Sequence, residues 1–475
     1  MGEGSTLTAM RGILSWSAYL PYRRLDRAEI AAFVGQGGGK GTRTVASYDE
    51  DSTTMAVEAA RLARRNCDIT PAQVLFATTT PAYADKTNAT GVHAALGLPS
   101  PSAAFDIGMS PRSAVGALLL ALDGQVPTLV VSADVRTGYA GSTEEAMQGD
   151  AAAAVVVGSD ADGPVLAEFL GSASVTDEYI ERWREPGDLR TKVWDERFSE
   201  VATLPLAVEA WNTALASAGI TASDVALAAV AAPVQRVARG VAGKLDGVQV
   251  VDDLSSTVGI AGAAQPGLVL AALLERVEPG QVVALVSAAD GADVLLFRAT
   301  DAITDHRPVR TVAAQLAVGG SLPYGKFLAW RGVLPVEPPR RAEPQRVSAT
   351  AAARNEAWKF AFVGSKERGT GVVHVPPARV SRDGEHTDEM DPAPLADKQG
   401  TIVTFTIDRL AYSPSPPIAF AVVDFDGGGR LPIELTDVDE AEVAIGMRVE
   451  MTFRRLFTAD GIANYFWKGR PVRDG

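Results

Sequence analysis

The chain has 475 residues, of which 47% are hydrophobic and 21% charged, and its formal net charge is −14. This length exceeds one ordinary hydrophobic core, so we expect two or three domains. The acidic balance argues against general nucleic-acid binding, which needs Lys and Arg to neutralise phosphates. No apolar run reaches the ~20 residues of a membrane span, and the N-terminal residues lack the pattern of a secretory signal. Cys67 is the single cysteine, which excludes an internal disulfide, and we predict a cytoplasmic protein.

Apolar, β-rich runs alternate with helical runs in the first part of the chain, as in layered α/β folds. A helix predicted over 54–64 follows the acidic run 49–51, and acidic residues favour a helix N-terminus. A second helix is expected over 113–122. The predicted strands are 74–78, 103–107, 128–132 and 152–157.

A second series of elements then repeats this order. Its predicted helix covers 267–275, and its predicted strands are 225–231, 248–252, 282–287 and 294–298. Both series end with a buried strand, a small-residue turn that contains Asp, and another buried strand. The repetition indicates an internally duplicated α/β unit.

The composition changes after the second series. Residues 331–354 are rich in Arg and Pro, which is typical of a linker over the surface, with an anion-binding role as the alternative. Beyond it the pattern is all-β, with a Gly-rich turn at 427–429, which fits an OB barrel. The strands predicted there are 400–408, 418–425, 430–436, 447–453 and 464–468.

Several motifs of the first 300 residues resemble, in order and spacing, hydroxymethylglutaryl-CoA synthases and the initiating ketoacyl-ACP synthases of the thiolase superfamily. They are YDEDSTTMAVEAARLA, VLFATTTPAY, LGLPSPSAAFDIG, GDAAAAVVVG, SVTDEYIERWREPGD and VGIAGAAQPGLVLAALLE. The resemblance implies a duplicated thiolase-like layered fold (α-β-α-β-α). The C-terminal part is similar to the OB-fold proteins that pair with thiolases, which carry a zinc ribbon before the barrel.

These observations predict four segments. A condensing-enzyme domain covers 1–305, in two similar halves of about 1–162 and 163–305. A helix and the Pro/Arg-rich linker follow over 306–354, a degenerate ribbon over 355–398, and the OB-fold over 399–475.

The resemblance also locates the catalytic positions of the superfamily, which uses a Cys nucleophile with a His and an Asn. These positions are occupied by Pro111, Ala231 and Ile260, and the general-acid Glu of the synthases by Thr79. Neither Cys67 nor any of the four histidines, His93, His306, His374 and His386, lies near them. The usual catalytic set is therefore missing.

Other side chains remain as weak candidates for chemistry. Ser110 precedes Pro111 and is a possible nucleophile, with a helix N-cap as the structural alternative. Tyr83 and Glu144 lie in segments that border the pocket in relatives, as do Asp134, Glu145 and Asp150, and Tyr or a carboxylate can transfer protons. The structural alternative for Asp134 and Asp150 is turn and cap hydrogen bonding.

Binding sites are indicated less directly. Arg236, Arg239 and Lys244 fit one helix face and could meet CoA phosphates, with a solvated face as the alternative. The four Cys positions of the ribbon fall on Ser365, Arg368, Ser381 and Gly384. Without thiolates we expect no zinc and no other metal cofactor.

Three functions follow as hypotheses. The first is an acyl-CoA-metabolism subunit without the Cys-His-Asn set, which binds acyl-CoA or scaffolds a catalytic thiolase-type partner, as a homodimer within a larger complex. The alternative is an active acyl-CoA enzyme, a retro-aldol lyase or a synthase-like acyltransferase, that uses other residues. The third, nucleic-acid binding by Phe405, Phe466 and Trp467 on the barrel, is disfavoured by the charge.

Overall fold

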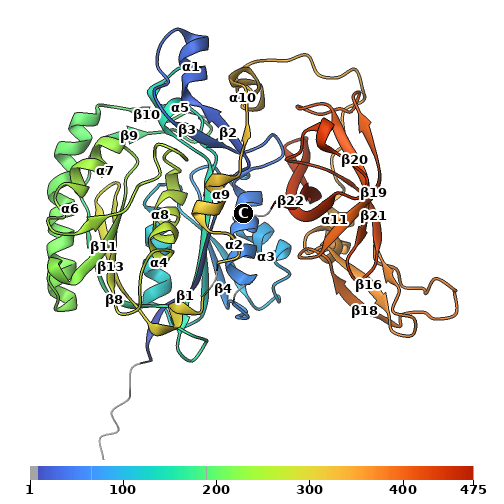
Figure 1. Ribbon diagram of the computed structural model, residues 1–475, viewed down its shortest axis with the longest axis horizontal. Coiled ribbons are helices and arrows are strands. Elements are labelled where there is room, and N and C mark those ends of the chain that lie inside the picture. The colour runs from blue at the N-terminus through green and yellow to red at the C-terminus, as the bar shows by residue number, and fades with distance from the viewer. Residues whose placement is uncertain (1–8, 66, 189, 307, 474–475) are drawn as a thin grey trace, which may run out of the picture.

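The computed structural model describes residues 9–65, 67–188, 190–306 and 308–473, which form a layered α/β body and a second, mainly β body side by side (Figure 1). Among the described helices none is long and apolar enough to cross a membrane.

The α/β body is built on a sheet of ten strands. Their order is β12 (Gln249–Val250), β11 (Val225–Ala231), β13 (Val282–Ala288), β14 (Ala292–Ala299), β8 (Ala167–Val175), β1 (Arg11–Tyr19), β7 (Ala151–Ser159), β6 (Thr128–Asp134), β4 (Gln73–Ala77) and β5 (Ala103–Ile107). The two halves of the sheet correspond strand by strand from the centre outwards. The first half has the order β1-β7-β6-β4-β5, and the second has the order β8-β14-β13-β11-β12. In each series the third strand is antiparallel to the second and parallel to the fourth. The short β1–β8 pairing joins the two halves.

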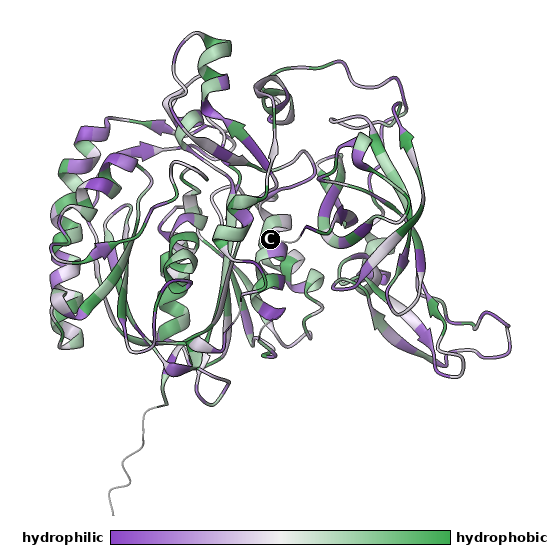
Figure 2. Ribbon diagram, viewed as in Figure 1, coloured by the Kyte–Doolittle hydropathy of each residue, from purple (hydrophilic) through white to green (hydrophobic). Residues whose placement is uncertain are grey.

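Helices separate and cover the two halves of the sheet. Two of them, α4 (Ser113–Asp123) and α8 (Gln265–Leu274), share one core with strands of both halves and form the middle layer. Outside the first half lie α2 (Ser52–Arg65) and α3 (Ala89–Ala95), and outside the second half lie α6 (Glu196–Ala218) and α7 (Gln235–Ala242). Figure 2 shows that the middle helices are apolar along most of their length, as expected for helices buried all round. The layers therefore follow the expected α-β-α-β-α order.

Smaller elements surround the carboxyl ends of the strands. They are the sheet β15-β2-β3 (Gly320–Ser321, Arg23–Asp26 and Thr42–Val45), the hairpin β9-β10 (Arg182–Trp183 and Lys192–Val193), and the helices α1 (Arg27–Val34), α5 (Thr143–Met147), α9 (Val312–Ala317) and α10 (Tyr324–Trp330). The short 3-10 helix η2 (Gly262–Ala264) precedes α8. Residues 331–348 then cross to the second body without a helix or strand (Figure 1).

The second body begins with α11 (Ala349–Arg354) and α12 (Glu356–Lys359), which precede a three-stranded ribbon and a barrel. The ribbon has the order β17 (Val373–His374), β16 (Val363–Glu367), β18 (Met390–Pro394). The barrel has the order β21 (Arg430–Glu434), β20 (Ile418–Phe425), β19 (Gln399–Asp408), β22 (Arg448–Ala459), β23 (Ile462–Pro471). A bridge between Leu435 and Gly469 closes it. Trp467, with no exposed surface, packs at the centre against Phe362 and Phe453, so it is a core residue and not a stacking platform.

Candidate functional site

A cavity of about 810 Å³ lies at the carboxyl ends of β4, β5 and β6. The loops after these strands supply Thr79, Thr80, Ser110, Pro111 and Arg136 to its wall. Other parts of its wall come from the segment 47–52, the hairpin β9-β10, Asp290, the end of α10 and β22 of the barrel. Carboxyl ends of parallel strands meet at one edge of a sheet, which is where α/β folds place their ligand sites.

The four positions that the sequence predicted for the catalytic set lie in two different surroundings. Pro111 lines the cavity just before α4, and Thr79 lines it just after β4. Ala231 ends β11 and Ile260 precedes η2, and both are buried outside the cavity lining. No cysteine or histidine of the described residues lines this cavity.

One carboxylate, Asp134 at the end of β6, connects the loop that contains Thr79 to η2. Its side chain has no exposed surface and accepts hydrogen bonds from the hydroxyl of Thr78 (3.0 Å) and from the N–H and hydroxyl of Thr79 (2.6 and 2.7 Å). It also accepts from the N–H of Ala263 in η2 at 2.8 Å. A Cβ at Gly262, where φ is +55°, would lie 2.1 Å from Asp134 Oδ2, so this loop requires glycine.

Three arginines gather around Thr79. Arg136 donates to Thr79 Oγ1 at 2.8 Å, and its guanidinium lies 3.7 Å from Asp134 and 3.6 Å from Glu144. Arg182 donates to Glu144 at 3.0 Å and to the carbonyl of Pro233 at 3.0 Å. Arg184 donates to the carbonyl of Thr79. This cluster places fixed charge in the cavity wall around Thr79.

Burial and mutual repulsion act on these cations. Burial lowers the pKa of Arg184, and the charge of Arg136 lowers it further. Burial also lowers the pKa of Arg182, against the attraction of Glu144. Because an arginine stays protonated in proteins, these three side chains give this wall of the cavity fixed positive charge.

Of the weak catalytic candidates, only Ser110 faces the cavity. Its hydroxyl lies 3.5 Å from that of Ser113. Ser110 is not the N-cap of α4, because the helix begins at Ser113 after Arg112; instead the Ser110 N–H donates to Ser113 Oγ at 3.3 Å. Tyr83 turns toward the barrel, where its hydroxyl accepts from the N–H of Ala463 at 2.9 Å. Glu144 does not line the cavity and forms ion pairs with Arg136 and Arg182.

The basic residues considered for CoA lie elsewhere. Arg236, Arg239 and Lys244 are exposed on α7 and at its end, and none of them lines the cavity. Arg236 forms an ion pair with Glu200 of α6 at 2.5 Å.

The arginine cluster was missed at the level of sequence. Arg182 and Arg184 flank Trp183 in the motif ERWREPGD, and Arg136 follows the buried strand that ends in Asp134. The feature of the sequence that could have indicated the cluster is a pair of arginines, two residues apart, in a segment next to the expected pocket. Nothing local indicated that Arg136 would join them.

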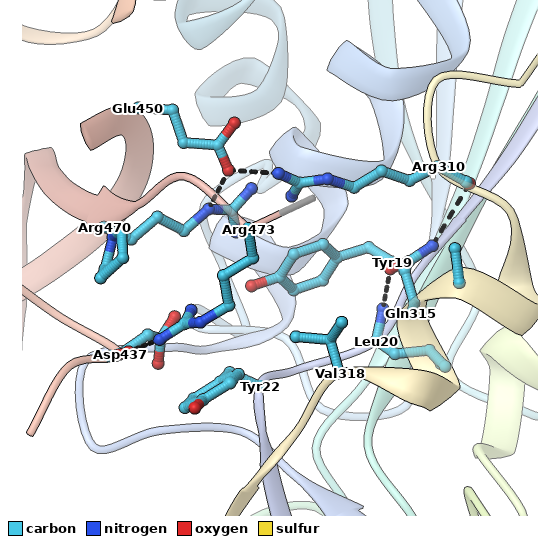
Figure 3. Close-up of a pocket in the computed structure, with 12 residues that line it drawn as sticks. Tyr19, Leu20, Tyr22, Arg310, Gln315, Val318, Asp437, Glu450, Arg470 and Arg473 are labelled. Carbon is cyan, nitrogen blue, oxygen red and sulfur yellow. Dashed lines mark hydrogen bonds and ion pairs between the residues drawn. The ribbon is translucent and has the colours of Figure 1, made fainter. Parts of the chain in front are cut away.

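A second polar site lies between the two bodies. Arg454 of β22 has no exposed surface and pairs with Glu50 at 2.5 Å and with Asp437 at 2.7 Å. Lys468 of β23 lies 3.0 Å from Asp49. A neighbouring pocket has a volume of about 60 Å³. Figure 3 shows its lining, in which Glu450 accepts hydrogen bonds from Arg310 and Arg470. The acidic run 49–51 therefore serves mainly the domain interface; within it, Asp51 also caps α2 by accepting from the N–H of Thr54.

The ribbon does not offer a zinc site of the thiolate type. At the four expected positions, Ser365 exchanges hydrogen bonds with the backbone of Ala378, and Arg368 pairs with Asp391. Ser381 and Gly384 supply no thiolate. The carboxylate of Glu367 instead accepts from the N–H of Arg382 at 2.8 Å and contacts His374 and Thr370.

Comparison with known proteins gives relatives for both bodies. Residues 394–454 match the family model described as ChsH2, C-terminal OB-fold domain. A hydroxymethylglutaryl-CoA synthase of Pyrobaculum neutrophilum is 27% identical over 350 residues, covering 68% of this chain and 97% of that protein. That of Aeropyrum pernix is 32% identical over 195 residues, covering 38% of this chain and 54% of that protein.

Solved structures give the same fold. An HMG-CoA synthase complexed with CoA has a TM-score of 0.58 and 18% identity, covering 67% of this chain and 89% of that one. MvaS in complex with 3-hydroxy-3-methylglutaryl coenzyme A has a TM-score of 0.58 and 20% identity, covering 71% and 95%. The predicted thiolase-like layered fold with a C-terminal OB domain is confirmed, and the chain is similar to hydroxymethylglutaryl-CoA synthases over about two thirds of its length.

Proposed function

We propose that this chain binds an acyl-CoA thioester without forming an acyl-enzyme, as a subunit that works beside a catalytic thiolase-type enzyme. The observation that supports the proposal is the large cavity at the strand ends, which Pro111, predicted at the position of the nucleophile, lines without a cysteine or histidine among the described residues beside it. Similar solved structures hold CoA or 3-hydroxy-3-methylglutaryl-CoA, which supports a CoA thioester as the ligand.

The chemistry of condensation supports a role in binding. Acyl transfer to the protein needs a thiolate or an activated hydroxyl, and a base to manage its proton. Pro111 provides neither, and among the described residues the Ser110 hydroxyl has the hydroxyl of Ser113 as its side-chain partner. The bound thioester is therefore expected to leave the site intact.

The assembly that we propose is a homodimer through the edge of the main sheet. Among the described strands, β5 has one neighbour, β4, and lies at the edge of the sheet. Phe105 in this strand is 53% exposed, and Met109 just after it is 56% exposed. An unpaired edge with exposed apolar side chains favours pairing with a second copy around a two-fold axis.

We further propose that the protein needs no zinc or other metal cofactor and acts in the cytoplasm. The hydrogen bonds of Glu367 would hold the ribbon together in place of a metal. A chelator such as EDTA is then expected to leave the melting temperature of the full chain unchanged.

Binding and turnover of the purified full chain test the proposal. We expect calorimetry to detect binding of acetyl-CoA and acetoacetyl-CoA, with no free CoA thiol released and no acyl mass added to the intact protein. A Cys67→Ser variant, which removes the single thiol, should behave identically. Turnover, or a stable acyl adduct, would contradict the proposal and favour an active enzyme; loss of that adduct in Ser110→Ala would identify the nucleophile.

The partner is tested by native mass spectrometry of the complex isolated from its own cell. We expect a thiolase-type enzyme with an intact Cys and His pair. If the chain is isolated only as a homodimer, without a second protein, the proposal of a thiolase-type partner is contradicted.

A further inference from the structure

The small pocket of Figure 3 lies where the two bodies meet and takes its lining from both of them. The α/β body supplies Tyr22, Arg310 and Gln315, and the barrel body supplies Asp437 and Arg473. Its volume of about 60 Å³ leaves room for about two water molecules or a small ion. A ligand of that size would contact both bodies at once.

Asp437 offers this pocket an acceptor that no described residue uses. The residue is 4% exposed, and its Oδ2 accepts from Arg454 at 2.7 Å. Its Oδ1 is buried and has no hydrogen-bond partner among the described residues. A buried carboxylate oxygen without a donor is unfavourable, so we expect solvent or a ligand to supply one.

Arg473 offers hydrogen-bond donors beside this carboxylate. It is half-buried, its Cζ lies 3.7 Å from the centroid of the Tyr22 ring, and it donates to the backbone carbonyl of Asp437. Within the described residues it forms no ion pair. Figure 3 shows its guanidinium next to Asp437 and over Tyr22. Because a guanidinium has five N–H donors, several remain for a ligand.

The other charged groups of the lining do not compensate Arg473. Glu450 accepts from both Arg310 and Arg470. Glu58, which lies behind the lining, is shared in the same way by Arg470 and Arg61. Each of these carboxylates thus already serves two arginines.

A further cation, Arg24, lies behind the pocket. Its guanidinium donates to four backbone carbonyls, two of them in the segment 315–318. Burial lowers its pKa to about 10, against the attraction of neighbours that include Glu50 and Asp437. Both of these carboxylates also pair with Arg454. Additional negative charge in the pocket would therefore be favourable.

We propose that this pocket binds a small oxyanion that keeps one O–H group, such as hydrogen carbonate or hydrogen phosphate. The O–H donates to Asp437 Oδ1, and the other oxygens accept from Arg473, whose planar guanidinium suits such anions. Sulfate has no proton to donate at neutral pH, so one of its oxygens would face the Asp437 carboxylate without a hydrogen between them. Because the ligand contacts both bodies, its binding would stabilise the docked barrel.

Calorimetry of the full chain tests the site with sodium hydrogen carbonate, sodium phosphate and sodium sulfate, at constant ionic strength and pH ~7.5. We expect hydrogen carbonate, phosphate or both to bind, and sulfate to bind at least ~10-fold more weakly, as the loss of a charged hydrogen bond implies. Asp437→Asn presents an amide N–H to the anion, so it should reduce this preference to less than ~3-fold.

Arg473→Gln should weaken binding of the preferred anion by at least ~10-fold, and Arg473→Lys should retain part of the affinity. This position lies outside the ion pairs of Arg454, so it stays informative if Asp437→Asn does not fold. Arg409→Gln is the matched control, because Arg409 is an exposed arginine of the barrel body that pairs with Glu440 and does not line the pocket. It should bind the anions as the wild-type chain does.

Three results would overturn the proposal. If neither hydrogen carbonate nor phosphate binds, the pocket holds water only. Equal affinities for sulfate and the preferred anion in the wild-type chain would exclude Asp437 as the acceptor of a ligand proton. An unchanged affinity in Arg473→Gln would place the anion elsewhere on the protein. None of these results depends on whether an acyl-CoA enters the larger cavity.

Discussion

At the scale of the residue, Asp134 determines the shape of the cavity wall. It joins the loop after β4 to η2 and faces the buried Arg136 at 3.7 Å. Asp134→Ala should leave this arginine and several N–H and hydroxyl groups without their acceptor, and lower the free energy of unfolding by ~3–5 kcal/mol. Urea unfolding followed by circular dichroism measures the change.

Asp123→Ala provides the control, since this carboxylate is exposed at the end of α4. It should change the free energy of unfolding by less than ~0.5 kcal/mol. Similar losses in the two variants would show that Asp134 has no special structural role.

Glu58, on the face of α2 that meets the barrel, makes the interface sensitive to acid. Burial alone would raise its pKa, but the charges of Arg61 and Arg470 outweigh this and lower it to about 2. A carboxylate with a depressed pKa in the folded state stabilises the protein above its unfolded pKa, and the effect is lost as the pH falls. Between pH ~4.5 and ~2 the chain should therefore lose stability on the order of 3 kcal/mol through this group alone.

Unfolding measured from pH 7 to pH 2 tests this expectation. Glu58→Gln should be less stable at neutral pH, and its stability should fall less steeply below pH ~4.5. Parallel curves for the variant and the wild-type chain would exclude Glu58 as a source of the acid sensitivity.

At the scale of the element, α2 links the two bodies. One of its faces packs on the first half of the sheet, and β22 of the barrel covers another, so nearly the whole helix is buried. The sequence predicts its position but not this burial, because its polar face contains Glu58 and Arg61, which would normally face water.

Arg454 of β22 is the central cation of this contact. Arg454→Met should leave Glu50 and Asp437 facing each other without a counter-charge and destabilise the docked state by ~3–5 kcal/mol. Hydrogen exchange should then become faster in α2 and β22 together, as the barrel separates from the first body.

Arg448→Met is a matched change in the same strand, where the arginine forms an exposed pair with Asp426. Its effect should stay within about 1 kcal/mol, with exchange in α2 unchanged. If both variants loosen α2 equally, the buried network is not what holds the barrel in place.

At the scale of the whole molecule, the exposed edge strand β5 should decide the oligomeric state. Phe105→Asp places a charge at the proposed two-fold contact and should convert a dimer into a monomer. Light scattering after size exclusion measures the mass directly. The control is Ile445→Asp, which changes an exposed apolar residue of the barrel body, and this variant should remain a dimer. A wild-type chain that is already monomeric would contradict the proposed homodimer.

Much of the fold was accessible from the sequence because it depends on local patterns. Buried strands such as 128–132 and 282–287 read as apolar runs, and both fall within observed strands. Strands β1 and β8, which join the two halves, were not predicted, and neither was α6, whose Pro205 interrupts the usual helical pattern.

By itself, the sequence determined an inventory of one cysteine and four histidines, and it predicted Pro111, Ala231 and Ile260 at the catalytic positions of the resembling enzymes. Only the tertiary structure decided that neither the cysteine nor any of the described histidines lines the cavity, and which side chains do. Thr79, Arg136 and Arg184 are separated by tens of residues, and their charges and hydrogen bonds meet only when three strand-end loops converge. The same is true of the acidic run 49–51, which looks like the start of a helix along the chain and becomes the docking surface of the barrel in the folded molecule.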